Sequence, residues 1–98
     1  MTTLPGHFHH DASNRLTYEV DALESVRYAT ICDRIVNKFD LSPAGEMVIG
    51  LDEMMREYTD GRNMIGLEWD NWSGFIVVAK NAGAETLVRA IAEFLARE

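Results

Sequence analysis

The sequence predicts an α+β protein, with a small antiparallel sheet of three or so strands packed by two helices. Two alternating apolar segments, at residues 64–70 and 75–80, predict a β-hairpin. Apolar residues at helical spacing predict an N-terminal helix at about residues 21–39 and a C-terminal helix at about residues 84–97. Because 98 residues suit one hydrophobic core, we expect these elements to pack together.

The first residues show no apolar period. They combine Pro5, Gly6 and three histidines with short polar residues, a composition typical of chain ends without fixed structure. We therefore expect a flexible N-terminal arm over residues 1–14 and a single α+β domain over residues 15–98.

An alternating segment at residues 15–20 predicts a short strand or an extended lead-in to the first helix. Asp21 is placed to cap that helix, and Glu24 can reach back to it from three residues on. The helix has a broad apolar arc that we expect to face the core. The arc comprises Ala22, Val26, Tyr28, Ala29, Cys32, Ile35, Val36 and Phe39.

Residues 43–58 allow two interpretations, a third helix or a strand. As a helix, the methionines and aliphatic residues of this segment would form one stripe. Against a helix, Gly45 and Gly50 lower helix propensity, and the following Asp60-Gly61 is typical of a hairpin turn. We favour a strand over about residues 52–58.

The hairpin at residues 64–80 has one register that keeps its apolar residues on one face. The loop Asn71-Trp72-Ser73 joins the strands, and Gly74 supplies the left-handed conformation that such a loop requires. A slip of one residue would mix the two faces. The expected cross-strand pairs are Trp69 with Phe75, Leu67 with Val77, and Ile65 with Ala79.

The C-terminal helix has one apolar and one charged side. Glu85, Arg89 and Glu93 follow each other at intervals of four residues, so they share the side that we expect to meet water. The apolar stripe comprises Ala84, Leu87, Val88, Ile91, Phe94 and Leu95.

Negative charge is concentrated in the middle of the chain. Residues 40–70 contain eight acidic residues against Arg56 and Arg62, and so carry six of the seven net negative charges. Such a field repels phosphate backbones and attracts basic surfaces. We therefore expect no nucleic-acid partner and favour a protein partner with a basic surface, although a merely solvated acidic face is the alternative.

The chain has no apolar run near the roughly 18 residues that cross a bilayer, and its first residues lack the basic and apolar pattern of a secretory signal. We expect a cytoplasmic protein without a membrane segment. A single cysteine, Cys32, agrees with a reducing compartment.

The two tryptophans of the hairpin have different expected roles. Alternation places Trp69 on the packed face, whereas Trp72 falls at the loop tip, where it either folds back over the sheet or contacts a partner. In the second case the indole and nearby acids would hold an Arg or Lys side chain. The candidate partner-binding residues are Trp72, Asp70, Asn71, Asp52, Glu53 and Glu57.

Three histidines near the N-terminus are candidate metal ligands. His7, His9 and His10 offer imidazole nitrogens, which suit zinc, nickel or copper. Their spacing matches no helical His-x-x-x-His pair, and a polar tail with incidental metal affinity is the alternative.

We expect a non-enzymatic protein-binding module of the adaptor, chaperone-like or inhibitor type, with no cofactor, because no catalytic constellation is visible in the sequence. Cys32 lies on the apolar arc, where a thiol is buried and inert. Met64, Ile76 and Val78 share the second face of the hairpin, so the protein is either a monomer or a homodimer that buries them. The alternative function is a small metal-dependent protein or enzyme that uses the N-terminal histidines.

Overall fold

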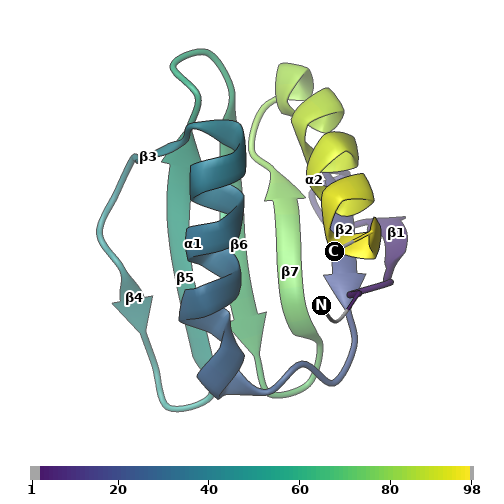
Figure 1. Ribbon diagram of the computed structural model, residues 1–98, viewed down its shortest axis with the longest axis vertical. Helices are drawn as coiled ribbons and strands as arrows, with labels where there is room; N and C mark the ends of the chain where they lie inside the picture. The colour runs from purple at the N-terminus through teal and green to yellow at the C-terminus, as the bar shows by residue number, and fades with distance from the viewer. Residues whose placement is uncertain (1–2, 98) are drawn as a thin grey trace.

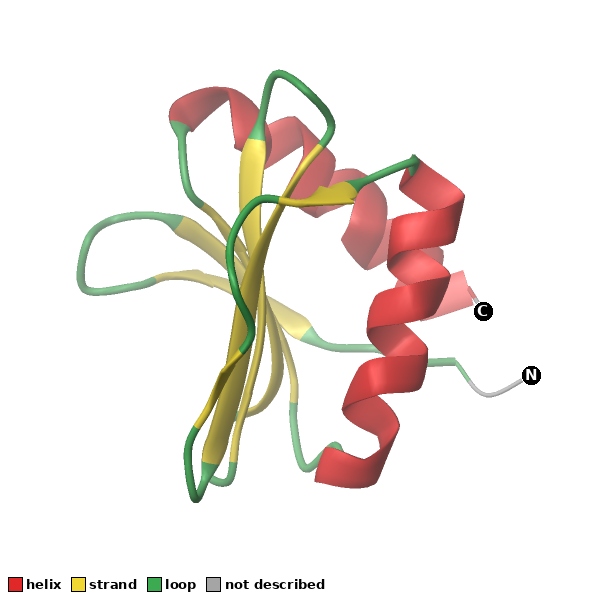
Figure 2. Cartoon of the chain, turned by 90° about the vertical axis from the view of Figure 1, so that its left-hand side faces the viewer, coloured by secondary structure: helices red, strands yellow, loops and turns green. Residues whose placement is uncertain are grey.

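An antiparallel sheet of seven strands carries both helices on one of its faces in the computed structural model, which describes residues 3–97 (Figures 1 and 2). The strand order is β1-β2-β7-β6-β5-β3, and the short β4 pairs with β5 outside this path. The strands are β1 His7–His10, β2 Leu16–Val20, β3 Ser42–Pro43, β4 Val48–Ile49, β5 Glu53–Thr59, β6 Met64–Asp70 and β7 Gly74–Ala79. The α+β prediction is confirmed, but three or so strands understates the sheet.

Each helix is preceded by a single 3₁₀ turn. The turn η1 (Ser25–Arg27) leads into α1 (Tyr28–Phe39), and η2 (Ala82–Ala84) leads into α2 (Glu85–Arg97). Neither helix is long and apolar enough to cross a bilayer, and the same holds for every helix among residues 3–97.

The predicted hairpin is confirmed in register and in loop. Trp69 pairs with Phe75 and Leu67 with Val77, as the apolar pattern requires. Gly74 adopts a φ of 88°, the left-handed conformation expected of it. The apolar stripe of α2 is also confirmed. It packs on the sheet face that carries Leu67, Phe75 and Val77.

The segment 43–58 contains strands, so the third helix is wrong and the strand interpretation is confirmed. β5 pairs with β6 over its whole length, from Glu53 opposite Asp70 to Thr59 opposite Met64. β5 also pairs with β3 and β4 on its other side. Hydrogen bonds to strands on both sides satisfy its backbone groups, so a strand at this position competes with the helix that the side-chain stripe suggests.

The first helix begins later than predicted. Ala22 has a φ of 58°, which no helix accommodates, and neither η1 nor α1 has a side-chain cap, so the expected Asp21–Glu24 arrangement is absent. Leu23 instead inserts into the core before the helix starts. As a result Ala22, Val26 and Ala29 are exposed, contrary to the predicted arc.

Part of the N-terminal segment pairs along the sheet, where the sequence predicted a flexible arm. β1 pairs with β2, from His7 opposite Glu19 to His10 opposite Leu16. Leu4 is buried, and its main-chain N–H donates a hydrogen bond to the Leu95 carbonyl at 2.8 Å. The strand was missed because four residues are too few for a recognisable alternation, and because it forms by covering the free edge of β2.

Candidate functional site

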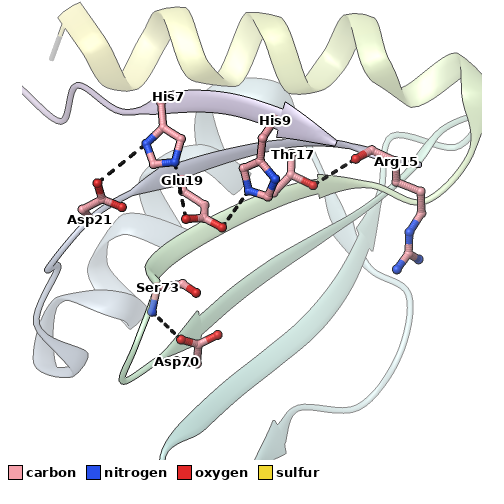
Figure 3. A network of polar contacts seen from close by, with 8 residues as sticks. All are labelled: His7, His9, Arg15, Thr17, Glu19, Asp21, Asp70 and Ser73. Atoms are coloured by element: carbon pink, nitrogen blue, oxygen red, sulfur yellow. Dashed lines mark hydrogen bonds and ion pairs between the residues drawn. The ribbon is translucent and has the colours of Figure 1, made fainter. Parts of the chain in front are cut away.

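The β6–β7 turn holds Trp72 at an exposed tip. One carboxylate oxygen of Asp70 accepts main-chain N–H groups from Trp72 at 2.9 Å and from Ser73 at 2.5 Å (Figure 3 draws the second bond). The Trp72 residue is 79% exposed, so its indole does not fold back over the sheet. Two hydrogen bonds hold the main chain of the turn, and its aromatic side chain is exposed to solvent.

A second loop lies beside this tip. The main-chain N–H of Asn71 donates to the carbonyl of Asp52 at 3.0 Å, which joins the β6–β7 turn to the β4–β5 connection. Leu51, the residue before Asp52, is 99% exposed. Figure 1 shows these two connections at the same end of the sheet as the start of α1.

A shallow groove of about 240 Å³ opens at this end of the sheet. Met54 and Trp69 contribute to its lining, and both also pack against the core. The indole N–H of Trp69 donates to the Leu23 carbonyl at 2.7 Å, so Trp69 is half-buried rather than fully internal. Val26, 81% exposed, and Ile49, 71% exposed, border the groove together with Leu51.

We call Val26, Ile49, Leu51 and Trp72 the apolar end of the protein. Single exposed apolar residues are ordinary, whereas four large ones near one end of a sheet are less common. The sequence analysis found only Trp72. The sequence held one indication that Ile49 is exposed, because this residue does not fit the apolar stripe of a helix. The exposure of Val26 depends on where α1 begins, which the sequence pattern did not show.

The candidate acidic residues divide into two groups. Asp52 and Glu53 are exposed beside the tip, and Glu53 lies directly opposite Asp70 across the β5–β6 pair. Like charges in opposite positions destabilise a sheet. Glu57 lies four residues further along β5, opposite Gly66, and so is separated from the tip.

A second candidate site lies on the sheet face opposite the helices, at the β1–β2 edge. His7 and His9 alternate onto this face together with Glu19 of β2. The Nε2 atom of His9 lies 2.7 Å from Oε1 of Glu19, and Nε2 of His7 lies 3.6 Å from its Oε2 (Figure 3). All three ligand atoms lie within 4.8 Å of one another.

His10 is not part of this cluster. It occupies the next position of β1, opposite Leu16, whose side chain belongs to the core. Glu19 was missed in the sequence analysis. The period-two spacing of His7 and His9 was the available signal, because it places both rings on one face of a strand.

The cluster has a defined charge preference. The hydrogen bond that the His9 ring donates to the Glu19 carboxylate is the main cause that raises the pKa of His9 above its ordinary value of 6.5. A carboxylate that favours a proton on His9 also favours any other cation held between the same atoms.

The sheet face opposite the helices, called the open face below, is only partly apolar outside the histidine cluster. Met64 and Ile76 are half-buried and Val78 is buried. An ion pair of 3.2 Å between Lys80 and Glu68 crosses the same face. Charged side chains therefore interrupt the apolar ones on this face.

Cys32 is buried, as expected. Burial raises the pKa of its thiol from 9.0 to about 12. A thiol with such a pKa supplies almost no thiolate near neutral pH, so Cys32 is unsuited to nucleophilic catalysis.

Comparison of the chain with protein-family models, with curated proteins and with solved structures gave no match.

Proposed function

We propose that this protein is a non-enzymatic binding module that presents its apolar end to a protein partner with a basic surface. The observation that carries the proposal is the exposure of four large apolar side chains at one end of the sheet, where a main-chain hydrogen bond joins the β6–β7 turn to the β4–β5 connection. Exposing them to water is costly, and full burial of such a side chain contributes about 1.5–3 kcal/mol.

The aromatic anchor is Trp72. Tryptophan is enriched among the residues that dominate binding energy, and a turn whose main chain is already held loses less conformational entropy when a partner arrives. The Asp70 carboxylate fixes the turn below the indole through its two main-chain hydrogen bonds. Its role is therefore to orient the tip as well as to add negative charge.

The charge of the partner follows from the acids around the apolar end. Asp52, Glu53 and Asp70 come from adjacent segments, and Glu53 lies opposite Asp70 in the strand pair, a placement in which like charges repel. An Arg or Lys side chain over the indole would relieve this repulsion and form a cation–π contact worth about 0.5–2 kcal/mol. Electrostatic attraction of this kind also accelerates association.

The experiment is affinity capture from native lysate at low and moderate salt, read by quantitative mass spectrometry and then repeated with the purified partner. Wild-type protein is compared with Trp72→Ala and with Leu51→Ser. The expected result is a basic protein that wild type retains directly and salt releases, and that both variants bind at least tenfold more weakly, the loss typical of a hot spot.

A charge series provides the matched control. Glu53→Gln and Glu57→Gln remove the same charge from β5, but only Glu53 lies beside the tip. We expect Glu53→Gln to slow association more than Glu57→Gln does. Equal retention of every bound protein by wild type and Trp72→Ala would contradict the proposal.

A further inference from the structure

We propose that His7, His9 and Glu19 bind one divalent transition-metal ion, best matched by Zn²⁺, on the open face of the sheet at the β1–β2 edge. The proposal uses a different set of residues from the protein-binding surface. Its three ligands come from two paired strands, which distinguishes the site from a polar tail with incidental metal affinity.

The β-structure itself brings the ligands together. Residues two apart on a strand share a face, so His7 and His9 project side by side, and their ring centroids are 5.8 Å apart. Glu19 lies directly opposite His7 on β2, and its two carboxylate oxygens face the two imidazoles (Figure 3). The backbone pairing therefore sets the approximate ligand positions before any ion binds.

The distances suit a small tetrahedral ion. Zn–N and Zn–O bonds of about 2.0–2.1 Å place neighbouring ligand atoms about 3.3 Å apart in a tetrahedron. The observed N–O separations of 2.7 and 3.6 Å lie on either side of this value. The shorter separation is to Oε1 of Glu19 and the longer one is to Oε2. The ligand atoms lie within 4.8 Å of one another, so side-chain rotations must draw them closer together to hold one ion.

Asp21 completes the orientation of one ligand. The Nδ1 atom of His7 lies 3.7 Å from the Asp21 carboxylate, while Nε2 of the same ring faces Glu19. A carboxylate on that side favours the tautomer with a proton on Nδ1, which leaves the Nε2 lone pair for a metal. Asp21 is 70% exposed at its side chain, so it can approach the ring when the ion binds.

The donor set also defines the class of ion. Two imidazole nitrogens and one carboxylate are borderline donors that favour Zn²⁺, Ni²⁺ or Cu²⁺, whereas Ca²⁺ and Mg²⁺ require oxygen-rich sites. Three protein ligands leave one tetrahedral position open. The side chain of His7 is half exposed, so this position is accessible to water or to a further ligand.

The experiment is a Zn²⁺ titration of the full, tag-free chain by calorimetry, with Co²⁺ absorption as a second readout of coordination. The variants are His7→Ala, His9→Ala and Glu19→Gln. The matched control is His10→Ala, which removes the same side chain from the same strand but from its other face. We expect binding at equal stoichiometry in wild type and the control.

Loss of a direct ligand should weaken binding by more than the 10- to 100-fold typical of an outer-shell partner. Circular dichroism in chelator shows whether each variant keeps its fold, and Glu19→Gln serves as the near-isosteric test if a histidine variant unfolds. Equal weakening by His10→Ala would overturn the proposal in favour of an unordered histidine-rich segment. Unchanged affinity in folded Glu19→Gln would also overturn it.

Discussion

The indole N–H of Trp69 donates a hydrogen bond to the main-chain carbonyl of Leu23 at 2.7 Å, across 46 positions of the sequence. This contact fastens β6 to the connection between β2 and α1, next to the groove of the apolar end. Trp72, only three residues further along the same hairpin, has an exposed side chain. One tryptophan therefore supports the surface and the other belongs to it.

The two tryptophans should respond differently to truncation. Trp69→Ala removes packing against the core and the bond to Leu23, so we expect a loss of about 3 kcal/mol in the free energy of unfolding. Trp72→Ala should change it by less than about 0.5 kcal/mol, as for an exposed position. Urea denaturation followed by circular dichroism measures both. Equal losses would show that Trp72 is packed in solution.

Gly74→Ala should destabilise the hairpin. Its φ of 88° disfavours any side chain, and an added Cβ would lie 2.3 Å from the carbonyl oxygen of Val20. We expect a loss of about 2–4 kcal/mol from strain and the clash together.

Substitutions at two other glycines distinguish the effect of backbone strain from that of the steric clash. Gly61 has a φ of 98° with open space around it, so Gly61→Ala tests the backbone strain alone at about 1–2 kcal/mol. Gly45 has open space and no positive φ, and Gly45→Ala should be nearly neutral. Thermal denaturation ranks the three variants, and a Gly74 variant no less stable than the Gly61 variant would exclude the clash.

Deleting the segment up to His10 should weaken the fold. The deletion removes the buried side chain of Leu4, the acceptor that its carbonyl offers to the Tyr18 hydroxyl, and the whole of β1. We expect a loss of at least about 2 kcal/mol, since burial of one leucine alone contributes about 1.5–3 kcal/mol. Chemical denaturation of the shortened chain provides the measurement. An unchanged free energy of unfolding would show that the N-terminal segment behaves as a flexible arm.

Stability should fall in alkaline solution. Burial raises the pKa of Cys32 from 9.0 to about 12 and raises that of Tyr28 as well. As pH rises above about 9, the unfolded chain releases these protons while the folded chain retains them, so unfolding becomes more favourable. Denaturation midpoints from about pH 8 to about pH 10.5 should decrease, and less steeply in Cys32→Ala. Parallel slopes in the two proteins would exclude the contribution of Cys32.

The sequence by itself determined the elements whose pattern is local. Alternation and the loop before Gly74 were enough for the β6–β7 register, because a shift of one residue would expose Trp69, Leu67 and Ile65 together. Helical spacing was enough for α2, and the position of Trp72 at a hairpin tip followed from the same loop.

Only the tertiary structure decided which distant segments meet. Ala22 has a left-handed backbone conformation, so α1 starts later than predicted and Val26 is exposed. The hydrogen bond between Asn71 and Asp52 brings Leu51 close to the hairpin tip. The pairing of β1 with β2 places Glu19 next to His7 and His9. Each of these arrangements depends on contacts between residues far apart in the chain. Periodicity reports only which side of its own element a residue occupies, so it carries no information about the neighbour across the sheet.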